Sequence, residues 1–121
     1  MSTPSTNLPA APTIPLSDDL RSAYTDLYTK LETEYQSNPD ATAREAIEPQ
    51  KVNVSNILTK DNMCRWDQDT ALFQALQAQI CSTTNGLKTL QTEIQKTAAH
   101  FQTASDIVGA ITKVLGLLSI S

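Results

Sequence analysis

The sequence predicts an all-α protein in which a helical hairpin is followed by a long, heptad-patterned C-terminal helix and preceded by a disordered arm. The chain of 121 residues contains only three glycines, whereas strand-rich folds need glycine at their many turns. Between residues 73 and 118, apolar residues recur at steps of three and four, the spacing of one helix face. These observations predict a helix-bundle or coiled-coil-like architecture.

Residues 1–16 hold four of the six prolines, mixed with Ser, Thr and Ala. Because proline fixes φ and lacks a backbone donor, this composition predicts a disordered arm. Residues 17–121 are long enough to form a single helical domain with a modest core.

The first helix is predicted over residues 18–36, with Ser17 as its N-cap. Its apolar positions step by four and three: Leu20, Tyr24, Leu27, Leu31 and then Glu34 or Tyr35. The residue before a proline is disfavoured in the α region, so a turn is expected at Ser37-Asn38-Pro39-Asp40.

The second helix is predicted over residues 40–61. Its stepping positions are Ala43, Ile47, Gln50, Val54 and Ile57. Pro49 removes one helical hydrogen bond. Two interpretations follow: one helix kinked at Pro49, or a short helix that ends near Ile47 and a second that starts at Pro49.

The third helix is predicted over residues 67–119 and carries what we call the heptad seam. The seam consists of Phe73, Leu76, Ile80, Thr83, Leu87, Leu90, Ile94, Thr97, Phe101, Ala104, Val108, Ile111, Leu115 and Leu118. Its spacing crosses "STTNG" at residues 82–86, which is a local turn signal. A break near 82–86 would give a four-helix bundle. A continuous helix of about 50 residues would be a rod about 75–80 Å long. The two shorter helices could cover only part of it, so the rest of its seam would be exposed. The continuous helix is favoured, because nothing would maintain the heptad spacing across a break between two separate helices.

The C-terminal stretch from Ile107 to Ser121 is the most apolar part of the chain. As a helix, its apolar run covers only about 18–22 Å of a bilayer core of about 30 Å, and Lys113 lies in its middle. A membrane span is therefore not expected, although contact with a membrane surface remains an alternative. A second stripe of small residues predicts close packing against another helix: Gly109, Thr112, Gly116 and Ser119.

Trp66 and Arg65 form a candidate anchor at the entry to the long helix. A lone tryptophan there either packs as a lid over the end of a bundle or stays exposed as an interface residue. The lid is the favoured interpretation.

The composition argues against several classes of function. The net charge is −4 and the nine Lys and Arg are scattered singly, so nucleic-acid binding is not expected. His100 is the only histidine, and Cys64 and Cys81 form no metal-binding motif. No enzyme, cofactor, metal or small-molecule substrate is expected. Free, buried thiols are favoured over a disulfide between the two cysteines.

The sequence therefore predicts a non-catalytic protein that acts by helix–helix association with itself or with another helical protein. Its layout is similar to that of small helical filament or rod subunits exported by bacteria, and the shared local feature is residues 37–40. That resemblance implies a self-assembling, secreted and virulence-associated subunit. The chain does not open on a signal peptide, which predicts a cytoplasmic protein or export without a cleavable signal. The alternative is a membrane-active protein, such as a toxin component or peripheral binder, that uses residues 104–120.

Overall fold

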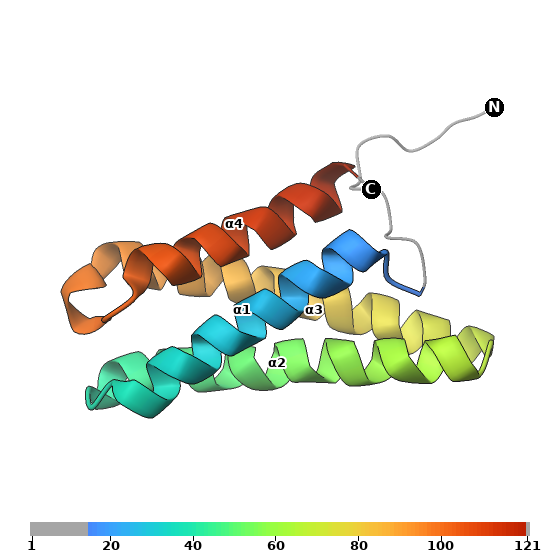
Figure 1. The fold of residues 1–121 in the computed structure, drawn as a ribbon, viewed down its shortest axis with the longest axis horizontal. Helices are drawn as coiled ribbons and strands as arrows, with labels where there is room; N and C mark the ends of the chain where they lie inside the picture. Colours follow the sequence, from blue (N-terminus) through green and yellow to red (C-terminus); the bar gives the residue numbers. More distant parts are fainter. Residues whose placement is uncertain (1–14, 121) are drawn as a thin grey trace.

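The computed structural model describes residues 15–120, and these residues form four α-helices: α1 (Asp18–Ser37), α2 (Ala41–Trp66), α3 (Thr70–Lys96) and α4 (Ala104–Ile120). A short 3-10 turn, η1 (Ala98–His100), lies between α3 and α4. Each helix packs against the next one along the chain, and α4 returns to pack on α1 (Figure 1). The all-α bundle prediction is confirmed. The predicted arm lies outside the described residues, except for Pro15 and Leu16.

The helix starts follow from local capping. The Ser17 hydroxyl accepts a hydrogen bond from the Leu20 N–H at 3.2 Å, as the sequence predicted. The third helix begins at Thr70 instead of residue 67, because the N-cap is Asp69, whose carboxylate accepts from the Ala71 N–H at 2.7 Å. Asp67 instead ends α2, with its N–H donating to the Met63 carbonyl at 3.0 Å.

Pro49 lies within α2, which is a single helix that continues to Trp66. The interpretation with two separate helices is wrong. Pro49 is exposed, so the carbonyl that loses its helical partner can be hydrated.

The prediction of one continuous helix over residues 67–119 is wrong, and so is the alternative break near 82–86. α3 runs through 82–86 and ends at Lys96. The Asn-Gly signal is overridden because Gly86 faces α2, where a Cβ would lie 2.3 Å from the Gln50 Oε1. Thr83 is fully buried, and the Thr84 hydroxyl donates to the Ile80 carbonyl within the helix at 2.7 Å. The glycine thus permits close helix packing instead of a turn.

The chain reverses direction at residues 97–103, which we call the corner. Thr97 leaves the helical region at φ −125° and ψ 38°, η1 follows, and Phe101 is extended. The corner brings α4 back antiparallel to α3, so the molecule is a four-helix bundle and not a rod (Figure 1).

Candidate interaction surfaces

The heptad seam lies mainly inside the bundle. Its α3 members from Leu76 to Ile94 are buried, and Phe73 is partly buried against the same core. In α4 the buried face consists of Ile107, Ala110, Ile111, Val114 and Leu118. The predicted seam residues Val108 and Leu115 are only partly buried, because the helix phase restarts after the corner. The exposed seam that predicted self-association is therefore covered by the chain's own helices.

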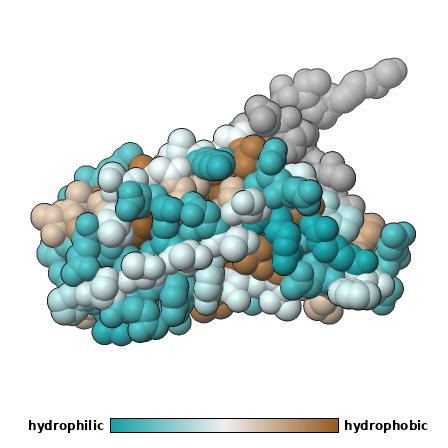
Figure 2. Space-filling model, in the orientation of Figure 1, coloured by the Kyte–Doolittle hydropathy of each residue, from teal (hydrophilic) through white to brown (hydrophobic). Residues whose placement is uncertain are grey.

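The face visible in Figure 1 carries no continuous apolar band. Figure 2 shows that it is mostly hydrophilic or neutral, with apolar residues in separate small areas. This agrees with a core that is satisfied within one chain.

The small-residue stripe faces solvent. Gly109 and Gly116 are exposed, and a Cβ at either position would meet nothing within 4 Å. The Thr112 hydroxyl accepts a hydrogen bond from the Gln91 amide of α3 at 2.9 Å. The side chain of Ser119 lies outside the described residues. No helix of the described chain packs closely on the two glycines.

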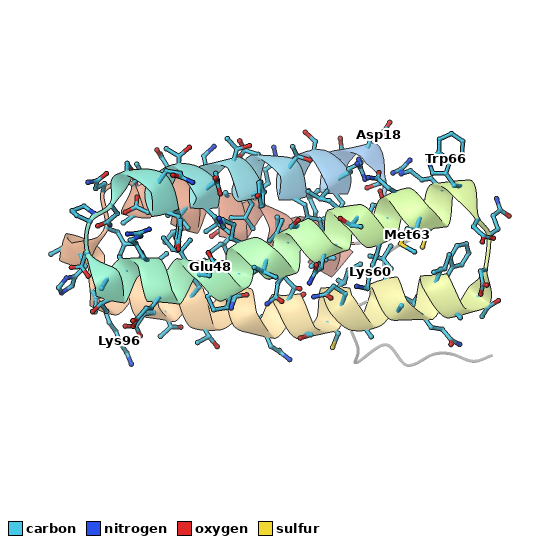
Figure 3. All side chains as sticks on the ribbon, turned by 90° about the horizontal axis from the view of Figure 1, so that it is seen from below. Asp18, Glu48, Lys60, Met63, Trp66 and Lys96 are labelled. Carbon is cyan, nitrogen blue, oxygen red and sulfur yellow. The ribbon has the colours of Figure 1, made fainter. Side chains whose placement is uncertain are left out.

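The turn between α2 and α3 forms a hairpin tip, which we define as residues 62–73. In Figure 1 this turn extends beyond the first residues of α1 and the last residues of α4. Trp66 is 90% exposed at the tip and Met63 is 47% exposed. Figure 3 shows Trp66 further along the bundle axis than Asp18 and pointing outward. The lid interpretation of Trp66 is wrong, because a side chain that is 90% exposed packs over no part of the described bundle.

Arg65 does not accompany Trp66 outward but joins a buried carboxylate, Asp61. The Asp61 side chain is fully buried and lies 2.5 Å from Arg21 Nη1 and 2.8 Å from Arg65 Nε. It also accepts from the Leu16 N–H at 2.7 Å, and Arg65 donates to the Leu16 carbonyl at 2.7 Å. These bonds align the start of α1 with residue 61, so the tip must project past it.

Both cysteines are free. Cys64 is buried, and burial, with a smaller contribution from the Asp61 charge, raises the pKa of its thiol. Cys81 is exposed, so the expectation that it is buried is wrong.

A second buried carboxylate, Glu34, binds the corner from α1. Its oxygens accept from the Gln102 N–H at 2.7 Å, the Thr103 N–H at 2.8 Å and the Thr103 hydroxyl at 2.6 Å. The Asn38 amide is a further donor. Burial raises the pKa of Glu34, but the four donors outweigh burial, and the net pKa is lowered. Glu34 is therefore held as a carboxylate at the start of α4, where the helix dipole also favours negative charge.

The last residue of α1 and the turn after it add further contacts to the corner. Asn38 donates to the His100 carbonyl at 2.8 Å, and His100 Nδ1 lies 2.6 Å from Asp40 Oδ2. The His100 hydrogen bond is the main cause of the lowered pKa of Asp40. Ser37 donates to the Gln102 side chain at 2.9 Å. We call these residues the corner cluster: Glu34, Ser37, Asn38, Asp40, His100, Gln102 and Thr103.

The corner cluster contains Ser, His and Asp side chains, but they are not arranged for acyl transfer. The Ser37 hydroxyl bonds to Gln102 and to the Thr33 carbonyl instead of to the imidazole. A nucleophile activated by His100 would need a hydrogen bond to that ring. Among the described residues, no group of three His, Cys, Asp or Glu side chains is placed to hold a metal ion.

Comparison with protein-family models, with curated proteins and with solved structures gives no significant match. Within residues 15–120, no helix has both the length and the apolar content needed to cross a bilayer.

Proposed function

We propose that this is a non-catalytic helical protein that acts by association with other helices, with a second copy of itself as the first partner. The single observation that carries the proposal is Trp66, which is 90% exposed at a projecting tip. Tryptophan offers a large apolar surface and is the residue type most enriched at the energetic centres of protein interfaces. No contact within the described chain accounts for its position.

The neighbours of Trp66 match the composition of an interface. Met63 adds an exposed, adaptable apolar side chain one turn earlier on α2. Asp67, Gln68 and Asp69 add exposed polar groups beside Trp66 at the tip. An apolar centre with a polar rim is the usual arrangement of a protein–protein contact.

Sedimentation velocity at increasing protein concentration tests the proposal. We expect a concentration-dependent oligomer at tens of micromolar, and Trp66→Ser should weaken it by about tenfold or more. Val52→Ser is the matched control, because Val52 is 46% exposed on α2 but lies before the tip, and it should leave the oligomer unchanged. A wild-type protein that stays monomeric throughout would refute self-association.

The alternative function, action on a membrane through residues 104–120, requires the apolar face of α4 to meet lipid. That face is packed against α1 and α3. We therefore expect no co-sedimentation with, and no leakage from, vesicles of neutral or anionic lipid. Binding of the native bundle to either vesicle would favour the membrane function.

A further inference from the structure

The sequence of the corner does not itself require a turn. Residues 97–103 read TAAHFQT and contain neither glycine nor proline. Helices usually end at a glycine or asparagine in the left-handed region, or shortly before a proline. Here the exposed Ala98 and Ala99 are the strongest helix formers. The local sequence is therefore compatible with a continuous helix from α3 into α4.

The heptad spacing also continues through the corner. Its steps from Ile94 to Thr97, Phe101, Ala104 and Val108 alternate three and four without a slip. In the bent form α4 buries the seam positions Ile111 and Leu118, but it also buries Ile107 and Val114, which lie outside the seam. Val108 and Leu115 are only partly buried, so the bent form does not use every seam position. A straight helix would align these seam positions along one side.

Apart from the burial of Phe101 in the core, the bend is stabilised by hydrogen bonds from the end of α1 and the turn after it. Glu34 binds the backbone N–H groups of Gln102 and Thr103, and Asn38 binds the carbonyl of His100. In a continuous helix those N–H groups would bond to carbonyls four residues earlier. Glu34 would then be a buried carboxylate with fewer donors, which is strongly unfavourable. The ionised Glu34 therefore opposes straightening.

We propose that α3 and α4 can straighten at the corner into one helix, and that α4 then docks in the groove between α1 and α3 of a second copy. The exchange is reciprocal, so two chains form a domain-swapped dimer with two antiparallel long helices. A second copy is the occupant that fits, because its α4 makes the same buried contacts that α4 makes within one chain. The proposal goes beyond the association proposed above: the corner and the Trp66 tip lie at opposite ends of α3, so a swapped dimer forms without Trp66. It assigns Glu34 as the residue that keeps α4 in its own chain.

The test uses Glu34→Gln, which removes the charge and keeps the size of the side chain. The variant is compared in a Trp66→Ser background, which removes association through the tip. There we expect the dimer fraction at a fixed concentration of about 100 µM to rise at least tenfold in sedimentation velocity. Glu32→Gln is the matched control: Glu32 is on the same helix but is more exposed and paired with Lys51, so it should change nothing. A purely structural role for Glu34 would lower stability without raising the dimer fraction.

Spin labels distinguish swapping from ordinary association. The labels are attached at Lys88→Cys and Lys113→Cys, in a chain whose own cysteines are replaced by Cys64→Ala and Cys81→Ser. The distance between the two labels reports whether α3 and α4 are bent or straight. The Gln91–Thr112 hydrogen bond places these sites on adjacent stretches of α3 and α4 in the bent form. In a straight helix they lie about 37 Å apart. Mixing labelled chains with an excess of unlabelled chains makes most dimers carry labels on one chain only, so the measured distance is the one within a chain. For the dimer we expect the long distance of the straight helix.

Two further variants keep the test informative if Glu34→Gln folds poorly. His100→Ala with Thr103→Ala removes two side-chain contacts of the corner and raises helix propensity, so it should also raise the dimer fraction. Ala98→Gly with Ala99→Gly, added to that variant, should lower the dimer fraction by at least about 20-fold, because each chain of the dimer then carries two glycines in its straight helix.

Three outcomes would overturn the swap. A dimer with the short intrachain distance would show self-association without exchange, which leaves the proposed function intact. Corner variants whose dimer fraction does not exceed that of their parent protein would do the same. A released α4 that binds neutral vesicles as a monomer would show that lipid, and not a second copy, covers its apolar face.

Discussion

The two ends of α1 are each fixed by one buried carboxylate, but the two carboxylates are stabilised by different chemistry. Asp61, beside the start of α1, is paired with the guanidinium groups of Arg21 and Arg65. Glu34, near the end of α1, has no cation among its partners and is bound by backbone, hydroxyl and amide donors. The Asp61 end is therefore held by charge pairing and the Glu34 end by hydrogen bonds at a helix start.

The difference has a structural consequence. The arginines at the Asp61 end come from α1 and α2, so this network fixes two helices that are already joined by a short turn. Glu34 instead connects α1 to residues 68 and 69 positions later in the chain, at the corner. Loss of Asp61 should weaken the whole bundle, whereas loss of Glu34 should act first on the placement of α4.

The largest expected effect on stability is that of Asp61→Asn. The substitution leaves Arg21 and Arg65 without their shared carboxylate and should lower the free energy of unfolding by about 3 kcal/mol. The two arginine side chains are 31% and 36% exposed, so hydration limits the loss. Urea unfolding followed by circular dichroism measures it.

Asp26→Asn is the control for that measurement. Asp26 forms an ion pair of the same type with Lys30, but on the exposed surface of α1. Its loss should cost about 0.5 kcal/mol or less. Equal effects of the two substitutions would show that charge pairing does not hold the Asp61 end.

The next largest effect is a pH dependence of the folding stability that arises from Glu34. The pKa of Glu34 is lowered below its ordinary value of 4.5, so the folded state favours the carboxylate. This contribution to stability is fully present above pH 4.5 and is lost as the pH falls below it, through the folded-state pKa. The pKa of Asp40 is also lowered, from an ordinary value of 3.8, so Asp40 likewise loses its contribution to stability as the pH falls.

Urea unfolding at pH 7 and at steps below pH 4.5 measures this dependence. Glu34→Gln should be less stable than the wild type at pH 7 and should lose less stability on acidification. Parallel pH profiles for the two proteins would show that Glu34 does not titrate differently in the folded and unfolded states.

The sequence predicts an all-helical chain and the starts of α1 and α2, and the positions of both buried carboxylates follow from the same spacing. Glu34 continues the apolar steps of Leu27 and Leu31, and Asp61 continues those of Val54 and Ile57. A carboxylate at a core-facing position must find donors, so each position signals a buried polar site. The sequence spacing shows that Glu34 faces the core. It does not show which groups donate to Glu34, because Gln102 and Thr103 come from a distant part of the chain.

The corner was not predictable from local sequence. The "STTNG" stretch carries turn signals and is helical, whereas TAAHFQT carries none and turns. In both places tertiary contacts decide the conformation: Gln50 lies against Gly86, and Glu34 binds Thr103. The sequence offers an exposed Trp66 only as the less favoured alternative for a related reason: how far Trp66 projects depends on where α1 begins relative to it.

The smallest effect concerns a buried polar group that has neither kind of partner. Tyr24 is fully buried in α1 between the two carboxylates, and its hydroxyl has no hydrogen-bond partner among the described residues. Burial raises the pKa of this phenol, which stays neutral at all ordinary pH values. Tyr24→Phe removes an unpaired hydroxyl and keeps the ring, so stability should rise by up to about 1 kcal/mol. A loss of 1 kcal/mol or more in urea unfolding would mean that the hydroxyl is bonded in solution, and the contrast with Glu34 and Asp61 would then disappear.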